Sequence, residues 1–250
     1  MGPVICLKLA TERDTPSQKA ESLVGHDHLM SALLPTQLQK AYETRFAGLT
    51  NYRRRVWEVL CGFFSKWIPP NATVLDLGSG YCEFINSVQA QRKYAMDLNP
   101  DIDTLAAPDV VALRQDCSAE WALSPEILDA VFTSNFFEHL PSKAALQATL
   151  QHAWRCLRPG GRMIMMGPNI KYIPGKYWDF FDHYIPLTEL SLAEALRMCG
   201  FEIETCVGRF LPYTMSQGRI YPVWMLRFYL AMPWTWPIFG KQFLVVARKN

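Results

Sequence analysis

The chain has 250 residues, half of them hydrophobic, and its 25 basic and 23 acidic side chains give a formal net charge of +2. This length suits one large α/β domain or two small ones, with ample apolar material for a core. The near balance of charge gives no reason to expect nucleic acid as a partner, and the only dense basic cluster, Arg53-Arg54-Arg55, is interpreted as a solvated helix face. The seven scattered cysteines, none at C-x-x-C or zinc-ligand spacing, predict reduced thiols, no metal site and a cytoplasmic protein.

The N-terminal part of the chain divides into two regions by composition. Residues 1–35 are polar and irregular and predict a loose leader. Residues 36–70 carry apolar side chains mostly at helical spacing, with an interruption near residues 48–51. This pattern predicts two helices that end at Pro69-Pro70.

From residue 71 onward, short apolar runs alternate with helical patterns. Strands are predicted over residues 73–77, 93–97, 110–114, 128–133, 162–166, 201–207 and 242–248. Helices are predicted over residues 83–91, 143–157 and 190–199. The alternation predicts an α/β fold that is doubly wound, with a mostly parallel seven-stranded sheet and helices on both faces, occupying residues 71–250.

Residues 211–240, between the last two predicted strands, form an insertion rich in proline, tryptophan and other large apolar residues. Its segment 222–239 is too short and too interrupted to span a bilayer, which takes about 20 apolar residues in sequence. Tryptophan, tyrosine and arginine beside aliphatic residues suit a lipid headgroup boundary. Two interpretations stay open: packing against the sheet edge or a dimer contact, and a shallow membrane contact at the inner face that brings the site to a lipid-linked acceptor.

The strongest motif is a glycine turn that joins the first predicted strand to a helix. Gly78 and Gly80 let the backbone approach a ligand, and the helix beyond offers free N–H groups. A dinucleotide-binding turn would have a third glycine where Glu83 stands. The carboxylates of Asp76 and Glu83 would repel a pyrophosphate, whereas they suit the sulfonium and ammonium of S-adenosylmethionine.

Acidic residues also stand at the ends of the second and third predicted strands. Ligands of open α/β sheets bind beyond these carboxyl ends. Asp97 can accept both ribose hydroxyls of an adenosine. Asp116 can accept the adenine amino group while the Cys117 N–H meets a ring nitrogen; alternatively, Asp116, which stands before Ser118, is a solvated acid or a helix cap.

Five segments in this order resemble class I S-adenosylmethionine-dependent methyltransferases of the broad type-11 group, over about residues 72–210. They are Asp-Leu-Gly-Ser-Gly (76–80), Ala-Met-Asp-Leu-Asn (95–99), Gln-Asp-Cys-Ser (115–118), Asp-Ala-Val-Phe-Thr-Ser-Asn-Phe-Phe-Glu-His-Leu (129–140) and Leu-Arg-Pro-Gly-Gly-Arg-Met-Ile (157–164). The resemblance implies a Rossmann-like methyltransferase fold with S-adenosyl-L-methionine as cofactor. It also implies that residues 36–70 form a lid over the cofactor, with ordinary helix packing as the alternative.

The same resemblance implies a role for each motif residue. The methionine portion would lie on Asp76, Gly78 and Gly80, the ribose on Asp97 with Leu98, the adenine on Asp116 with Cys117, and the sulfonium and acceptor beside Asn135 and Phe136. The sequence departs from many relatives at Cys82, where they have glycine.

The second half of the chain is similar to a narrower set of methyltransferases, found near glycosyltransferases in bacterial surface-polysaccharide and glycolipid clusters. The similarity lies in residues 168–172, 177–183 and 209–213. It favours a small-molecule, sugar or lipid-linked acceptor in polysaccharide biosynthesis, with a hydroxyl as the expected nucleophile.

A hydroxyl acceptor must lose a proton, and histidine is the side chain best suited to take it near neutral pH. His139 and His183 are the candidate catalytic bases; His139 is alternatively a structural histidine. Substrate-binding candidates lie in the polar, aromatic loop that begins at Asn169. In that loop Tyr177 and Trp178 could stack on a sugar ring, and Asp179 and Asp182 could bind hydroxyls or hold the tautomer of His183.

The sequence therefore predicts methyl transfer from S-adenosylmethionine to a small-molecule or glycoconjugate acceptor. A nicotinamide-dependent oxidoreductase is the less favoured alternative, because Glu83 replaces the third glycine. A catalytically silent, methyltransferase-like binding module is the other alternative, and the intact acids at positions 76, 97 and 116 speak against it. The oligomeric state is left open.

Overall fold

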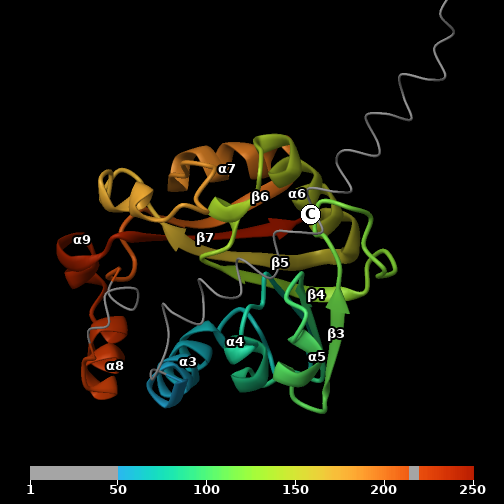
Figure 1. Cartoon of the computed structure of the whole chain (residues 1–250), viewed down its shortest axis with the longest axis horizontal. Coiled ribbons are helices and arrows are strands. Elements are labelled where there is room, and N and C mark those ends of the chain that lie inside the picture. The colour runs from blue at the N-terminus through green and yellow to red at the C-terminus, as the bar shows by residue number, and fades with distance from the viewer. Residues whose placement is uncertain (1–49, 214–219) are drawn as a thin grey trace, which may run out of the picture.

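The computed structural model describes residues 50–213 and 220–250, which are arranged around a seven-stranded sheet of order β3-β2-β1-β4-β5-β7-β6 (Figure 1). The strands are β1 (Thr73–Leu77), β2 (Arg92–Asp97), β3 (Val110–Arg114), β4 (Leu128–Ser134), β5 (Leu157–Pro168), β6 (Phe201–Val207) and β7 (Gln242–Lys249). The strand order reverses between β1 and β4, which pair in parallel. This confirms the predicted doubly wound sheet, and it places the carboxyl ends of β1, β2 and β4 at one edge.

Strands β1 to β5 are parallel, whereas β7 runs antiparallel to both β5 and β6. Strand β5 begins five residues earlier than predicted, at Leu157 rather than Arg162. Pro159, Gly160 and Gly161, expected to separate helix from strand, lie inside β5 instead. The ladder between β4 and β5 is irregular at this point, and Gly160 has a φ of +80°. The predicted turn is therefore a local irregularity within β5.

Helices cover both faces of the sheet (Figure 1). One face carries α3 (Thr50–Phe64), α4 (Glu83–Ser87) and α5 (Ile102–Leu105); the other carries α6 (Lys143–Cys156) and α7 (Glu189–Met198). The bounds of α6 and α7 agree with prediction to one residue. Helix α4 is shorter than the predicted 83–91, because Val88 has extended backbone.

Helix α3 belongs to the core. Its residues Trp57, Leu60 and Phe64 are buried, and the Trp57 ring packs edge-on against Phe132 of β4 at 5.9 Å between centroids. This contact agrees with ordinary helix packing, the alternative interpretation of the segment, and the lid over residues 36–70 stays a prediction. The remainder of that segment and the predicted leader, residues 1–35, lie outside the described residues.

The insertion predicted between the last two strands contains α8 (Val223–Ala231), η4 (Pro233–Thr235) and α9 (Trp236–Phe239). Trp236 is buried and packs against Phe210 at 5.0 Å between ring centroids, whereas Trp224 and Trp234 are exposed. The insertion thus combines internal packing with an exposed aromatic face. Among the described residues, no helix has the length and apolar character needed to cross a membrane.

Candidate active site

The chain turns sharply where β1 ends. Gly78, Gly80 and Cys82 all have left-handed backbone, with φ of +70°, +51° and +57°. A Cβ atom on Gly80 would meet nothing within 4 Å, whereas one on Gly78 would lie 2.1 Å from Cγ of Phe136. Gly80 therefore borders open space, and Gly78 lets Phe136 lie directly on the turn.

Asp76, two residues before the turn, is a buried acid with only 3% of its surface exposed. Burial raises its pKa well above the usual range, the charge of Asp97 adds to the rise, and a hydrogen bond from the Ile85 N–H opposes it. Within the described residues, its Oδ2 atom has no hydrogen-bond partner. A buried, unpartnered carboxylate oxygen is suited to bind a cationic group or a hydrogen-bond donor.

Asp97, at the end of β2, holds the glycine turn as well as facing the site. Its Oδ2 accepts a hydrogen bond from the Gly80 N–H at 2.7 Å, and its Oδ1 accepts one from the Asn99 N–H at 2.9 Å. Burial raises the pKa of Asp97, and backbone N–H groups and the charge of His139 oppose the rise. Because each carboxylate oxygen has further acceptor capacity, Asp97 can also accept ribose hydroxyls. Its neighbour Leu98 is half exposed beside it.

The adenine-side candidates follow β3. Asp116 is exposed, and its Oδ1 accepts hydrogen bonds from the Ser118 N–H and hydroxyl, both at 2.8 Å. Asp116 is thus an exposed acid that closes a turn at Ser118 and caps no helix, and Oδ2 remains for a ligand. Cys117 is buried, and its Sγ accepts a hydrogen bond from the Thr149 hydroxyl at 3.3 Å. Any contact of Cys117 with adenine would come from its backbone.

Asn135 redirects the chain after β4. It has a φ of +50°, and its N–H donates to the Met166 carbonyl at 2.8 Å. Asparagine tolerates this left-handed conformation better than most residues. The turn places Phe136 on Gly78 and leads into the short helix η1 (Phe137–His139).

Two segments far apart in sequence bring the candidate bases together. His139 Nδ1 lies 2.9 Å from the backbone oxygen and 3.2 Å from Oδ2 of Asp182. The ring of His183 packs edge-on against His139 at 4.9 Å between centroids. Asp182 therefore orients His139, a contact that the sequence did not predict, and its role toward His183 stays a prediction.

Glu138 completes this cluster as a carboxylate with 2% of its surface exposed. Burial raises its pKa to about 7, and the neighbouring His139 opposes that rise. For His139 itself, burial lowers the pKa, but the hydrogen bond to Asp182 and the charges of Glu138 and Asp182 outweigh it, so the net pKa is raised. Since the charge of His139 also acts on Asp97, the cluster adjoins the glycine turn.

The sequence predicts no metal site, yet Glu138, His139 and His183 place possible ligand atoms within 4.8 Å of one another in the described part of the chain. Two imidazoles and one carboxylate form a donor set that divalent transition metals accept. No local pattern indicates this cluster, because Glu138 and His139 are separated from His183 by the whole of α6 and β5.

The predicted substrate loop divides into buried and exposed residues. Tyr177 is fully buried and its hydroxyl donates to the Ile185 carbonyl, so it packs the loop and cannot stack on a sugar ring. Asn169 is fully buried too, with its amide nitrogen donating to Glu189 Oε2 at 2.6 Å, so its predicted contact with substrate is also corrected. Trp178, 52% exposed, and the exposed Asp179 in η2 (Lys176–Asp179) remain available to an acceptor.

The sequence of residues 49–205 matches the methyltransferase domain family over more than half of the chain. The chain belongs to this family. A comparison of its sequence with curated proteins found no match.

Solved structures share its fold at low sequence identity. An S-adenosylmethionine-dependent methyltransferase from Archaeoglobus fulgidus is 18% identical with a TM-score of 0.60, covering 84% of this chain and 98% of that one. A chain of the complex between the Haloferax volcanii Trm112 methyltransferase activator and a methyltransferase is 16% identical with a TM-score of 0.59, covering 88% of this chain and 97% of that one. The [4+2]-cyclase SpnF is 15% identical with a TM-score of 0.54, covering 77% of this chain and 80% of that one, so the fold carries more than one chemistry.

The cofactor of the methyltransferase is S-adenosylmethionine, and the residues at the glycine turn fit it. The unpartnered Oδ2 of Asp76 suits the ammonium group, the open space at Gly80 leaves room for the ligand, and Asp97 has acceptor capacity for the ribose. When bound, the cofactor supplies a methyl group on a positively charged sulfur. Phe136, which lies on this turn, directly precedes η1 and its His139.

Proposed function

We propose that the methyltransferase methylates a hydroxyl group on a sugar or other glycoconjugate carried by a membrane lipid, with His139 as general base. The observation that carries this proposal is the pairing of His139 with Asp182 next to the cofactor end of the sheet. A carboxylate that receives Nδ1–H leaves Nε2 as the basic nitrogen and stabilises the imidazolium that forms when the acceptor loses its proton. A hydroxyl acceptor needs such a base, whereas the leaving thioether needs no proton.

His183 supports this role by position. Its ring lies between Tyr177 and Phe180, with centroid distances of 4.8 and 4.9 Å, and touches His139 edge-on. Together with the hydrogen bond to Asp182, this packing fixes the orientation of the imidazole of His139. The exposed Trp178 and Asp179 would contact the sugar, one by stacking and one by accepting hydroxyls.

A membrane-borne acceptor is favoured by the exposed apolar side chains of the insertion. Of helix α8 only Leu230 is buried. Large apolar side chains with more than half of their surface exposed follow one another here: Trp224, Phe228, Trp234, Ile238 and Phe239. Exposed apolar side chains gathered in one segment favour an interaction site, and the proposed partner is the cytoplasmic face of the membrane, where surface glycolipids are assembled.

The test is incubation of the purified protein with labelled S-adenosylmethionine and separated lipid, sugar and small-molecule extracts. We expect label in the lipid fraction, as an ether stable to mild alkali. His139→Ala should lower turnover by about two to four orders of magnitude, while His152→Ala on α6 should leave it unchanged. Cofactor binding without transfer to any fraction would indicate a binding module instead. Full turnover by His139→Ala would exclude His139 as the general base.

A further inference from the structure

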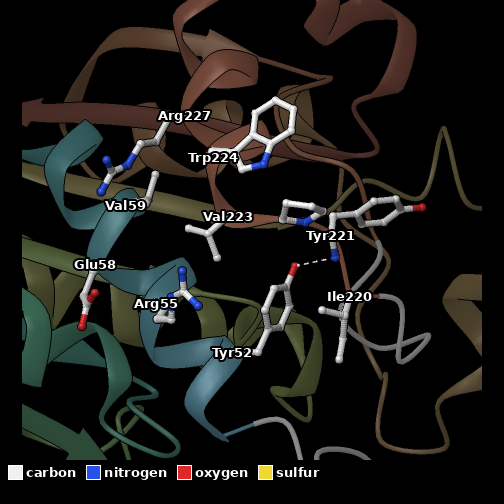
Figure 2. Close-up of a pocket in the computed structure, with 10 residues that line it drawn as sticks. Tyr52, Arg55, Glu58, Val59, Ile220, Tyr221, Val223, Trp224 and Arg227 are labelled. Carbon is white, nitrogen blue, oxygen red and sulfur yellow. Dashed lines mark hydrogen bonds between the residues drawn. The ribbon is translucent and has the colours of Figure 1, made fainter.

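A cavity of about 580 Å³ lies outside the candidate active site, between α3 and the start of α8 (Figure 2). Its polar and aromatic lining consists of Tyr52, Arg55, Glu58, Tyr221, Trp224 and Arg227. The two walls meet at one end, where the Tyr221 N–H donates to the Tyr52 hydroxyl oxygen at 3.3 Å. The cavity is therefore formed jointly by the core helix and the aromatic insertion.

The cavity has an excess of positive charge. Arg55 on α3 and Arg227 on α8 are both exposed, and in the described part of the chain neither forms an ion pair. Glu58 is the one acid among the described lining residues. Its Oε1 lies 3.9 Å from Nε of Arg54, so part of its negative charge is balanced by Arg54. Residues 205–250 contain no aspartate or glutamate, so this part of the chain adds no negative charge near the cavity.

These side chains present several hydrogen-bond donors to the cavity. Each guanidinium offers a planar set of N–H groups that matches the oxygens of a phosphate. The Tyr52 hydroxyl accepts from Tyr221, so its own proton remains to be donated. Two free guanidiniums and a phenol favour an anion with several oxygens, and a phosphate is the commonest of these in cells.

The surroundings of the cavity indicate where that phosphate comes from. Trp224 lines the cavity and packs edge-on against Phe228 at 5.8 Å between ring centroids, and each is 60% exposed. A soluble phosphate compound would leave these rings in water. A lipid would have its phosphate in the cavity while the rings enter the headgroup layer, where aromatic side chains are favoured.

We infer that this cavity binds the phosphate of an anionic membrane lipid and thereby docks the methyltransferase on the bilayer. The inference rests on the membrane contact in the proposed function and extends it to a specific headgroup site. Arg55 and Arg227 bind the phosphate oxygens from opposite walls. The aromatic rings of α8 then lie at the depth of the headgroups.

The experiment measures the partition of the full-length protein onto vesicles, without cofactor or acceptor. Three vesicle types are compared: phosphatidylcholine alone, phosphatidylcholine with phosphatidic acid, and phosphatidylcholine with oleate adjusted to the same surface charge. We expect preference for phosphatidic acid over oleate. The double variant Arg55→Gln, Arg227→Gln should lose about twenty-five-fold in partition onto phosphatidic acid vesicles, about fivefold for each arginine, and should lose the preference.

Arg92→Gln is the matched control, since it removes one exposed arginine from the amino end of β2 and should change partition less than twofold. Unchanged partition of the double variant, or an equal loss on oleate vesicles with no preference in the unaltered protein, would overturn a phosphate site. If the double variant loses binding of glycerol phosphate in solution but keeps vesicle binding, the cavity takes a soluble phosphate and the lipid assignment fails. Because no turnover is measured, failure of the proposed methyl transfer would leave this result standing.

Discussion

The guanidinium of Arg53 forms a two-point ion pair with the carboxylate of Glu83, the first residue of α4. Both side chains are about one-eighth exposed, so the pair is only partly screened by water. It joins helix α3 to the end of the glycine turn. Glu83 thereby acts mainly as the partner of Arg53, and less as a free charge for the cofactor than its place in the sequence indicates.

Breaking this pair should destabilise the fold more than breaking an exposed pair on the same helix. In a double-mutant cycle of Arg53→Gln and Glu83→Gln, measured by urea unfolding, we expect a coupling free energy of about 1 kcal/mol. The cycle of Arg54→Gln and Glu58→Gln, whose atoms are 3.9 Å apart and mostly exposed, should give a coupling close to zero. Equal couplings in the two cycles would mean that the Arg53 pair does not fix the turn.

The two glycines of the turn should respond differently to the same substitution. Gly80→Ala costs only the left-handed backbone strain of about 1–2 kcal/mol, because its Cβ meets no atom. Gly78→Ala adds a clash with the Phe136 ring. The free energy of unfolding of this variant should therefore fall below that of Gly80→Ala, and Phe136 should move. Urea unfolding and the fluorescence response to S-adenosylmethionine measure both effects. Equal losses for the two variants would contradict the contact between Gly78 and Phe136.

Asp97→Ala should weaken S-adenosylmethionine binding by about 1.5–3 kcal/mol, the value of hydrogen bonds to a charged group. The variant loses the expected ribose acceptor and also the carboxylate that holds the Gly80 and Asn99 N–H groups. Asp103→Ala, an exposed acid on α5, is the control and should bind as the unaltered protein does. Calorimetry gives the affinities, and circular dichroism verifies folding. Unchanged affinity in folded Asp97→Ala would refute the ribose assignment.

The pH dependence of turnover should reveal the partner of His139. A general base works in its neutral form, so activity falls as the pH falls through its pKa. Because the pKa of His139 is raised above its ordinary 6.5, this loss should begin at a higher pH than for an isolated histidine. Asp182→Asn removes a negative charge that stabilises the imidazolium, and should shift the acidic limb of kcat to lower pH. The exposed Asp179→Asn should not shift it; an unchanged limb in Asp182→Asn would exclude the pairing.

The features that local sequence determines were predictable. The strands and the helices α6 and α7 follow from the periodicity of apolar residues, and the turn at Gly78 and Gly80 from its position between strand and helix. The acids at positions 76 and 97 follow from the rule that parallel strands end at one edge. Each of these patterns extends over a few residues, so it can be recognised without knowledge of the tertiary structure.

What the sequence left open depends on contacts between distant segments. His139 and Asp182 are 43 positions apart, and no local pattern indicates that they meet. Tyr177 and Trp178 are neighbours with the same aromatic character, yet one is fully buried and the other half exposed. Only the packing of the loop against η1 decides which of them can reach an acceptor. The early start of β5 similarly follows from its pairing with β4.

Trp234 and Trp236 separate the two interpretations of the insertion, because they stand two positions apart in opposite environments. Trp236 is 9% exposed, packs against Phe63 and Phe210, and donates its Nε1–H to the Tyr229 carbonyl at 3.0 Å. Trp236→Ala should therefore lower the free energy of unfolding by about 3–5 kcal/mol. Trp234 is 70% exposed, so Trp234→Ala should leave stability within about 0.5 kcal/mol.

The effects on membrane binding should be reversed. Trp234→Ala should lower co-sedimentation with anionic vesicles several-fold, because an exposed indole at the headgroup boundary is lost. Trp236→Ala, measured at a temperature where it remains folded, should co-sediment as the unaltered protein does. Urea unfolding supplies the stabilities and sedimentation with vesicles the partition. Vesicle binding that is insensitive to Trp234, or absent from the unaltered protein at low salt, would leave packing as the only role of this segment.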